Sequence, residues 1–227
     1  RSKQRAYAYL TTPPDKKLTE TATRRLEVLQ SLVEFRVGGE TGVKEVQFLE
    51  GDALWKAADD GLWSEKVADA AMAAELGPGQ PPIRKLVRTA PFNEVPHWGI
   101  LVTYKDGFRA VVLKIGEKHT RWNFACQLKD DRQPRATSFY VGPWGNPNLF
   151  MALSHSIQTH FRQKRAPYAV ERTLLSSGIL AAAVDSRVAK GKAVATPHLE
   201  FGYVGRDFNE MREKGGSWKV ITEKKRQ

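Results

Sequence analysis

The loop over residues 139–148 carries the side chains best suited to hold a small ligand. It combines the flat rings of Tyr140 and Trp144 with the side-chain amides of Asn146 and Asn148. Rings can stack on the face of a sugar and amides can bond to its hydroxyls, so the loop predicts a sugar contact. The alternative is structural. A tryptophan in the position of Trp144 more often anchors the next helix, which begins with an N-cap residue followed by proline.

Trp122 is placed to join this contact from a strand predicted over residues 121–128. Side chains alternate between the two faces of a strand, so Trp122 shares a face with Phe124, and Asn123 takes the opposite face. Where this strand lies beside the loop, Trp122 adds a third ring to the same cleft.

The sequence predicts neither a metal site nor a catalytic nucleophile. His155 and His160 are five positions apart, whereas two imidazoles that share a metal on one helix are four apart. Cys126 is the single cysteine and lies in an apolar run, which is typical of a buried, inert thiol. Serines in the last predicted helix have no evident His and Asp partners.

The first element that must position these side chains is a helix that begins at Leu18. Its apolar positions recur at helical spacing and end before Gly38-Gly39, a common stop signal. A strand over 43–49 and a short helix over 52–58 follow. A further helix spans 64–76, with Ser64 as its expected N-cap. Residues 77–82 are rich in glycine and proline and predict an exposed loop.

After that loop the apolar period changes to two, which predicts a sheet. Lys105-Asp-Gly107 is a strong hairpin turn. Short connections predict mostly antiparallel pairing. The expected strands are 97–104, 108–115, 121–128, 136–141 and an edge strand at 202–206. Two amphipathic helices, from Leu149 to Phe161 and from Val170 to Ser186, complete the pattern.

The predicted fold class is therefore α+β, a mostly antiparallel open sheet covered by helices. One domain is expected over residues 18–206. Residues 1–17 are basic and contain Pro13-Pro14, and they are assigned to no part of the domain, although 6–10 fits a short strand. Residues 207–227 are expected to form a basic tail.

Composition narrows the function classes. A net charge of +11 and a pI near 9.8 raise the possibility of nucleic-acid binding. No helix-turn-helix, zinc-finger or aromatic single-strand platform accompanies that charge, so nucleic acid is the least favoured partner. No apolar run is long enough to cross a bilayer, so no membrane partner is expected, and the cytoplasm is the default location.

Several stretches carry a resemblance to a known family. They are Leu101–Leu113 with its Asp-Gly turn, Asn148–Ile157, Pro167–Ser186 and Pro197–Leu199. Together they resemble the C-terminal domain of the Gfo/Idh/MocA oxidoreductases, the glucose-fructose oxidoreductase and inositol dehydrogenase family. The resemblance extends back to about Ala22. It implies a helix at the entrance of the domain, an open sheet and two covering helices.

The same resemblance implies where catalysis is expected. Family members carry His-x-x-Asp on the entrance helix, and the matching positions here are Arg24 and Glu27. An arginine does not exchange a proton near neutral pH, so this pair lacks the family's general base. The competing interpretation is an ordinary exposed ion pair on the helix face opposite the apolar stripe, a face that also carries Ser31 and Glu34.

The resemblance implies NAD(P) for a full-length member, bound by a Rossmann domain. No Gly-x-Gly-x-x-Gly turn is present, so this chain alone is expected to bind no cofactor. The leading hypothesis is the substrate-binding and oligomerisation domain of an oxidoreductase acting on a sugar or cyclitol. It is expected to form homo-oligomers through the sheet face. The alternative is a non-catalytic assembly or partner-binding module.

Overall fold

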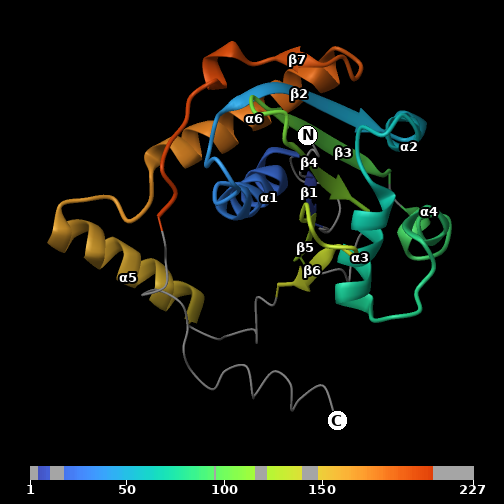
Figure 1. Ribbon diagram of the computed structural model, residues 1–227, viewed down its shortest axis with the longest axis horizontal. Coiled ribbons are helices and arrows are strands. Elements are labelled where there is room, and N and C mark those ends of the chain that lie inside the picture. Colours follow the sequence, from blue (N-terminus) through green and yellow to red (C-terminus); the bar gives the residue numbers. More distant parts are fainter. Residues whose placement is uncertain (1–4, 11–17, 95, 116–121, 140–147, 207–227) are drawn as a thin grey trace, which may run out of the picture.

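The computed structural model describes residues 5–10, 18–94, 96–115, 122–139 and 148–206 (Figure 1). Its central feature is a seven-stranded sheet with strand order β6-β5-β1-β4-β3-β2-β7. All neighbours pair antiparallel except β1 and β4, which are parallel. The predicted α+β class with a mostly antiparallel sheet is confirmed. The strands are β1 Arg5–Leu10, β2 Val43–Glu50, β3 Trp98–Tyr104, β4 Arg109–Lys114, β5 Trp122–Gln127, β6 Arg135–Ser138 and β7 Val194–Ala195.

Helices lie on both faces of the sheet. Figure 1 shows α1 and α6 on one face and α2, α3 and α4 on the other. The helices are α1 Leu18–Val33, α2 Asp52–Asp59, α3 Glu65–Leu76, α4 Ile83–Leu86, α5 Asn148–Gln163 and α6 Val170–Val188, with short 3-10 turns η1 Phe92–Glu94 and η2 Pro197–Leu199.

Two apolar cores follow from this three-layer arrangement. Val46, Ile100 and Val112 point toward α1 and α6, while Val111 and Leu113 point toward α2–α4. Since both faces of β3 and β4 are covered, their apolar residues form a continuous run instead of alternating with polar ones.

Most of the expected elements form where the sequence places them. The helix from Leu18 ends at Val33, and the hairpin turns at Lys105-Asp-Gly107, where Gly107 has a φ of 81°. Ser64 caps α3, since its Oγ accepts a hydrogen bond from the Val67 amide. None of the described helices is both long enough and apolar enough to span a membrane.

Two parts of the sheet differ from the expectation. Residues 202–206 form no strand, and the edge is the short β7, which pairs with β2. Arg5–Leu10 forms β1, which lies between β4 and β5 inside the sheet. This segment was left outside the domain because its partners, β4 and β5, are about 100 residues away and no local pattern reveals them.

Gly42 closes the domain at the start of β2. Its φ is +89°, and a Cβ atom there would lie 2.5 Å from both the Leu199 carbonyl oxygen and the Phe201 amide nitrogen. Those atoms belong to the backbone, so they cannot turn aside as a flexible side chain could. Gly42 is therefore required both for its conformation and for the close approach of residues 199–201.

We expect Gly42→Ala to lower the free energy of unfolding by at least about 3 kcal/mol, since left-handed strain of about 1 kcal/mol adds to a backbone collision. Gly39→Ala is the matched control, because Gly39 also has a positive φ but a Cβ there meets nothing within 4 Å. Urea unfolding followed by circular dichroism measures both. Equal losses in the two variants would contradict the close approach at Gly42.

Candidate functional site

The two predicted catalytic positions lie on α1, but their side chains have different surroundings. Arg24 is exposed, whereas Glu27 is half-buried and accepts a hydrogen bond from the Ser176 hydroxyl of α6. Glu27 therefore helps to join α1 to α6. An exposed guanidinium can bind an anion or a hydroxyl, but it supplies no proton acceptor.

The helix face that carries this pair is not a solvated face along its whole length. Glu34 was expected on the polar side of α1, but it is only 2% exposed. Arg25 is also fully buried, and its guanidinium lies 5.4 Å from the ring centroid of Trp98. Its spacing from Ala22 and Leu29, three and four residues, places it within the apolar stripe. That spacing was the sequence signal for its burial.

The predicted sugar-contact residues are not tested by the structure. Tyr140, Trp144 and Asn146 lie outside the described residues. Asn148 begins α5 and Trp122 begins β5, but their side chains are not among those described. The expected alternation along β5 holds next to Trp122, where Asn123 faces α3 and donates a hydrogen bond to Glu75. A sugar contact by the loop stays a prediction.

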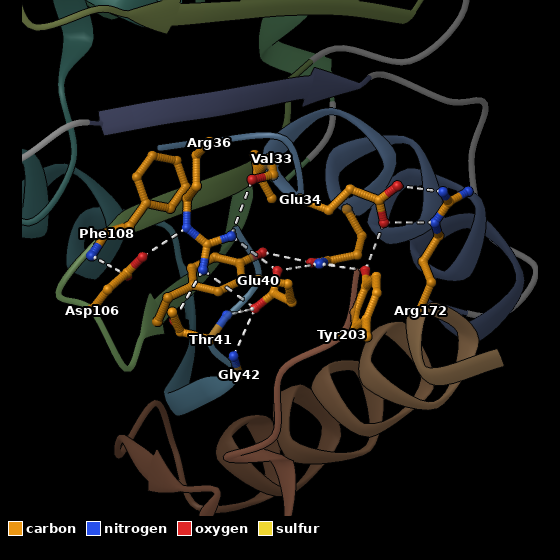
Figure 2. A network of polar contacts seen from close by, with 12 residues as sticks. Val33, Glu34, Arg36, Glu40, Thr41, Gly42, Asp106, Phe108, Arg172 and Tyr203 are labelled. Carbon is orange, nitrogen blue, oxygen red and sulfur yellow. Dashed lines mark hydrogen bonds and ion pairs between the residues drawn. The ribbon is translucent and has the colours of Figure 1, made fainter. Parts of the chain in front are cut away.

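A buried polar network surrounds the C-terminal end of α1 (Figure 2). Its first centre is Glu40, which accepts bonds from the Thr41 and Gly42 amides at 2.9 and 2.7 Å. The Arg36 guanidinium pairs with the same carboxylate at 2.9 Å and with Asp106 of the hairpin turn at 2.8 Å. This centre ties the end of α1 to the start of β2 and to the β3–β4 turn.

The second centre is Glu34. Arg172 of α6 forms a two-pronged ion pair with this carboxylate, and the Tyr203 hydroxyl donates a further bond at 2.7 Å. A guanidinium matches a carboxylate in this forked geometry, which an ammonium cannot do. Glu34 therefore binds α1 to α6 and to the segment that follows η2.

Gln30 joins the two centres. Its Nε2 donates to Glu40 and to the Tyr203 hydroxyl, and its Oε1 accepts from the Tyr104 hydroxyl at 2.8 Å. Burial raises the pKa of Tyr104 well above its usual value, and the negative charge of Glu40 adds to that shift. Burial and the bond to Glu34 likewise raise the pKa of Tyr203. Both phenols therefore remain protonated donors at neutral pH.

The two carboxylates of this network already have several hydrogen-bond partners each. Glu40 accepts from two backbone amides, Arg36 and Gln30, and Glu34 accepts from Arg172 and Tyr203. Carboxylates so fully bonded hold elements together and leave little capacity to accept a proton from a substrate. We therefore assign the network a structural role.

An open polar cleft lies on the opposite face of the sheet. Glu45, Thr103 and Arg109 stand side by side on β2, β3 and β4, because Glu45 pairs with Thr103 and Thr103 pairs with Arg109. Gln47 and Leu101 form the next row, and Leu62 closes one side. The cleft has a volume of about 230 Å³. Glu45, Gln47, Thr103 and Arg109 are half-buried there, and Lys44 on its rim is exposed.

The row offers an acceptor, a hydroxyl and a donor in sequence across the sheet. Neighbouring strands are about 4.8 Å apart, so the outer two positions are separated by about 10 Å. Ligand sites for drug-sized molecules are about 300–1,000 Å³, so this cleft suits a smaller molecule. Within the described part of the chain, no group of His, Cys, Asp and Glu could hold a metal ion.

Sequence reasoning did not find this cleft. Glu45 and Gln47 were seen only as part of a strand, and Arg109 only as part of a hairpin. A signal was present, since alternating polar residues on β2 and a polar pair across the hairpin occupy one face. The register that aligns them comes from strand pairing, which cannot be deduced from the sequence alone.

Comparisons with known proteins give structural likenesses at low identity. No protein-family model matches the chain, and no curated protein matches it. Among solved structures, it is similar to a probable dehydrogenase from Thermotoga maritima, with a TM-score of 0.43 and 11% identity over 86% of this chain. It is also similar to an NAD-binding protein from Listeria innocua, with a TM-score of 0.37 and 11% identity over 85% of this chain.

The chain spans only part of each of these proteins, 56% of the first and 55% of the second. Their activities and ligands belong to those whole proteins.

We expect Arg172→Ala to lower the free energy of unfolding by about 3–5 kcal/mol, because it leaves the Glu34 carboxylate buried without its cation. Removing both partners in Glu34→Ala/Arg172→Ala should cost less than the sum of the single changes. Urea unfolding of the four proteins gives the coupling energy.

The exposed Arg165 supplies the matched control, since Arg165→Ala removes an arginine five residues before α6 for which no ion pair is described. Arg172→Lys keeps the charge but not the forked geometry, and it should fall between wild type and Arg172→Ala. If the losses of the two single variants simply add up in the double variant, the pair does not stabilise the fold. The same conclusion holds if Arg172→Ala lowers the free energy of unfolding no more than Arg165→Ala does.

Proposed function

We propose that this chain is the substrate-side domain of an oxidoreductase of the Gfo/Idh/MocA type, which binds a small polyhydroxylated molecule such as a sugar or cyclitol. The observation that carries the proposal is the polar cleft over β2, β3 and β4. A carboxylate, a hydroxyl and a guanidinium in one row present both acceptors and donors, which hydroxyl groups on adjacent carbons require.

Three further observations support this assignment. Leu62 and Leu101 give the cleft apolar surface against which the carbon ring of such a ligand can pack. The entrance helix α1, its Gly-containing turn and β2 occur in the order that the sequence resemblance implies. The volume of about 230 Å³ suits a single ring rather than an extended chain.

In this proposal the chain binds and orients, and the oxidation chemistry belongs to NAD(P) held by a separate nucleotide-binding domain. The sequence contains no dinucleotide-binding fingerprint of its own. Arg24, at the position of the family's histidine, is exposed, and a guanidinium can hold a hydroxyl or an anion. A proton acceptor for the alcohol would have to come from another residue or another domain.

The rival proposal is a non-catalytic module for assembly or partner binding. Two observations favour it: the family's base is replaced by arginine, and α5 carries an apolar face that none of the described residues covers. The expected assembly through the sheet face would have to use the cleft end of the sheet, because α2–α4 cover the apolar part of that face. Ligand binding at the cleft distinguishes the two proposals.

We expect myo-inositol or glucose, titrated into the isotopically labelled chain, to shift the amide resonances of β2, β3 and β4. Thr103→Val keeps the side-chain volume and removes one hydroxyl, and Arg109→Ala removes the main donor. Each should weaken binding about tenfold, which corresponds to about 1.4 kcal/mol.

Arg88→Ala is the matched control, since Arg88 is exposed and does not line the cleft. It should bind as the wild type does. If neither probe shifts these strands, or if Arg88→Ala weakens binding as much as Arg109→Ala, the cleft is not a polyol site and the assembly module becomes the better assignment.

A further inference from the structure

Helix α5 carries an apolar stripe that no described element covers. Leu153, Ile157 and Phe161 recur at intervals of four and are 55%, 47% and 75% exposed. Figure 1 shows α5 standing apart from the sheet and from the helices that cover it. An isolated helix of 16 residues is only marginally stable in water, so α5 requires a partner for its apolar face.

The same chain carries an apolar groove that no described residue fills. It lies between the end of α1 and β5, and its volume is about 270 Å³. Phe35 and Val37 on its rim are 55% and 85% exposed. The apolar part of the α1–β5 groove is lined chiefly by Leu32, Phe35, Val37, Phe108, Phe124 and Leu128, and Arg36 and Gln127 are its polar lining residues.

We propose that α5 of one copy packs into the α1–β5 groove of a second copy, reciprocally, so that two chains form a two-fold dimer. Each chain supplies one helix and one groove, so each of these two apolar surfaces meets the other in a second copy of the same molecule. Exchange of an element between identical chains is a common route to such dimers.

The centre of each surface is apolar, which favours a second copy over a partner selected by charge. The cations near α5, Arg162, Lys164 and Arg165, come at and after its end, and they are not interleaved with the stripe. An acidic partner could be held by those cations alone and would leave Phe161 uncovered. The net charge of +11 opposes pairing of two copies, but at physiological salt it is screened beyond about 8 Å.

The contact is large enough for specific association. A helix of 16 residues is about 24 Å long and about 10 Å wide, so one helix in one groove covers roughly 240 Å² on each side. Two reciprocal contacts bury about 1,000 Å² in total, at the lower limit for a specific interface. The dimer should therefore form in a concentration-dependent way.

Sedimentation velocity of the purified 227-residue chain over a range of concentrations tests the proposal. Wild type should pass from monomer to dimer. Phe161→Asp on the helix and Val37→Asp in the groove should each weaken dimerisation at least tenfold. Both residues are exposed, so both variants should remain folded by circular dichroism. Val188→Asp is the control, because Val188 is 80% exposed at the end of α6 and lies outside both surfaces. This variant should dimerise as the wild type does.

Mixing the two defective variants gives the decisive result. Val37→Asp keeps an intact helix and Phe161→Asp keeps an intact groove, so their heterodimer regains one full contact. The mixture should associate more strongly than either variant alone. No gain on mixing, a wild type that stays monomeric at every concentration, or an equal defect in Val188→Asp would overturn the proposal. Binding of monomeric wild type to phosphatidylserine vesicles through Phe161 would assign the stripe to a lipid surface and would also overturn it.

Discussion

The arrangement of this domain depends on neutralising two buried carboxylates at the C-terminal end of α1. Glu34 and Glu40 are only 2% and 6% exposed, and Glu34 directly follows the C-terminal end of α1, which is a region of negative potential. Each carboxylate is therefore stable only if a cation reaches it. Arg172 comes from a helix 138 residues further along the chain, and Arg36 from the turn that follows α1. Because both ion pairs must form together with the packing of the sheet, they fix where α1, α6 and the β3–β4 hairpin meet.

The second constraint is coverage of the sheet on both faces. The apolar residues of β3 and β4 point both ways, so a single layer of helices would leave one set in water. Helices α2, α3 and α4 cover the second set with Ala68, Met72 and Leu86. They stop short of the row formed by Glu45, Thr103 and Arg109, whose polar side chains need no apolar cover. The cleft is thus the part of the sheet that the second helical layer leaves open.

Local signals in the sequence were sufficient for the elements that depend on near neighbours. The Leu18–Val33 stripe, the Ser64 cap and the Asp-Gly turn each act within a few residues, and each forms as predicted. Long-range partners were not accessible in the same way. No sequence pattern near Arg5–Leu10 indicates that its partners are β4 and β5. Likewise, no pattern near Glu34 indicates that it pairs with Arg172. The same limit explains why the polar cleft was missed, since its three residues come from strands that only the register aligns.

The distribution of polar groups separates the residues that hold this molecule together from those left for function. Around Glu34 and Glu40 every carboxylate oxygen is bonded to the protein itself, so binding a ligand there would first require breaking an ion pair. Over β2–β4 the side chains of Glu45, Thr103 and Arg109 are half-buried and reach solvent, and the only contact described for the Arg109 guanidinium is a long bond to the Gly61 carbonyl oxygen. A ligand there displaces mainly water. The apolar groups divide in the same manner. Those facing the sheet are buried, whereas no described residue covers the α5 stripe or fills the α1–β5 groove. Exposed apolar patches of this kind are typical of contacts with other molecules, which is the role that we propose for both surfaces.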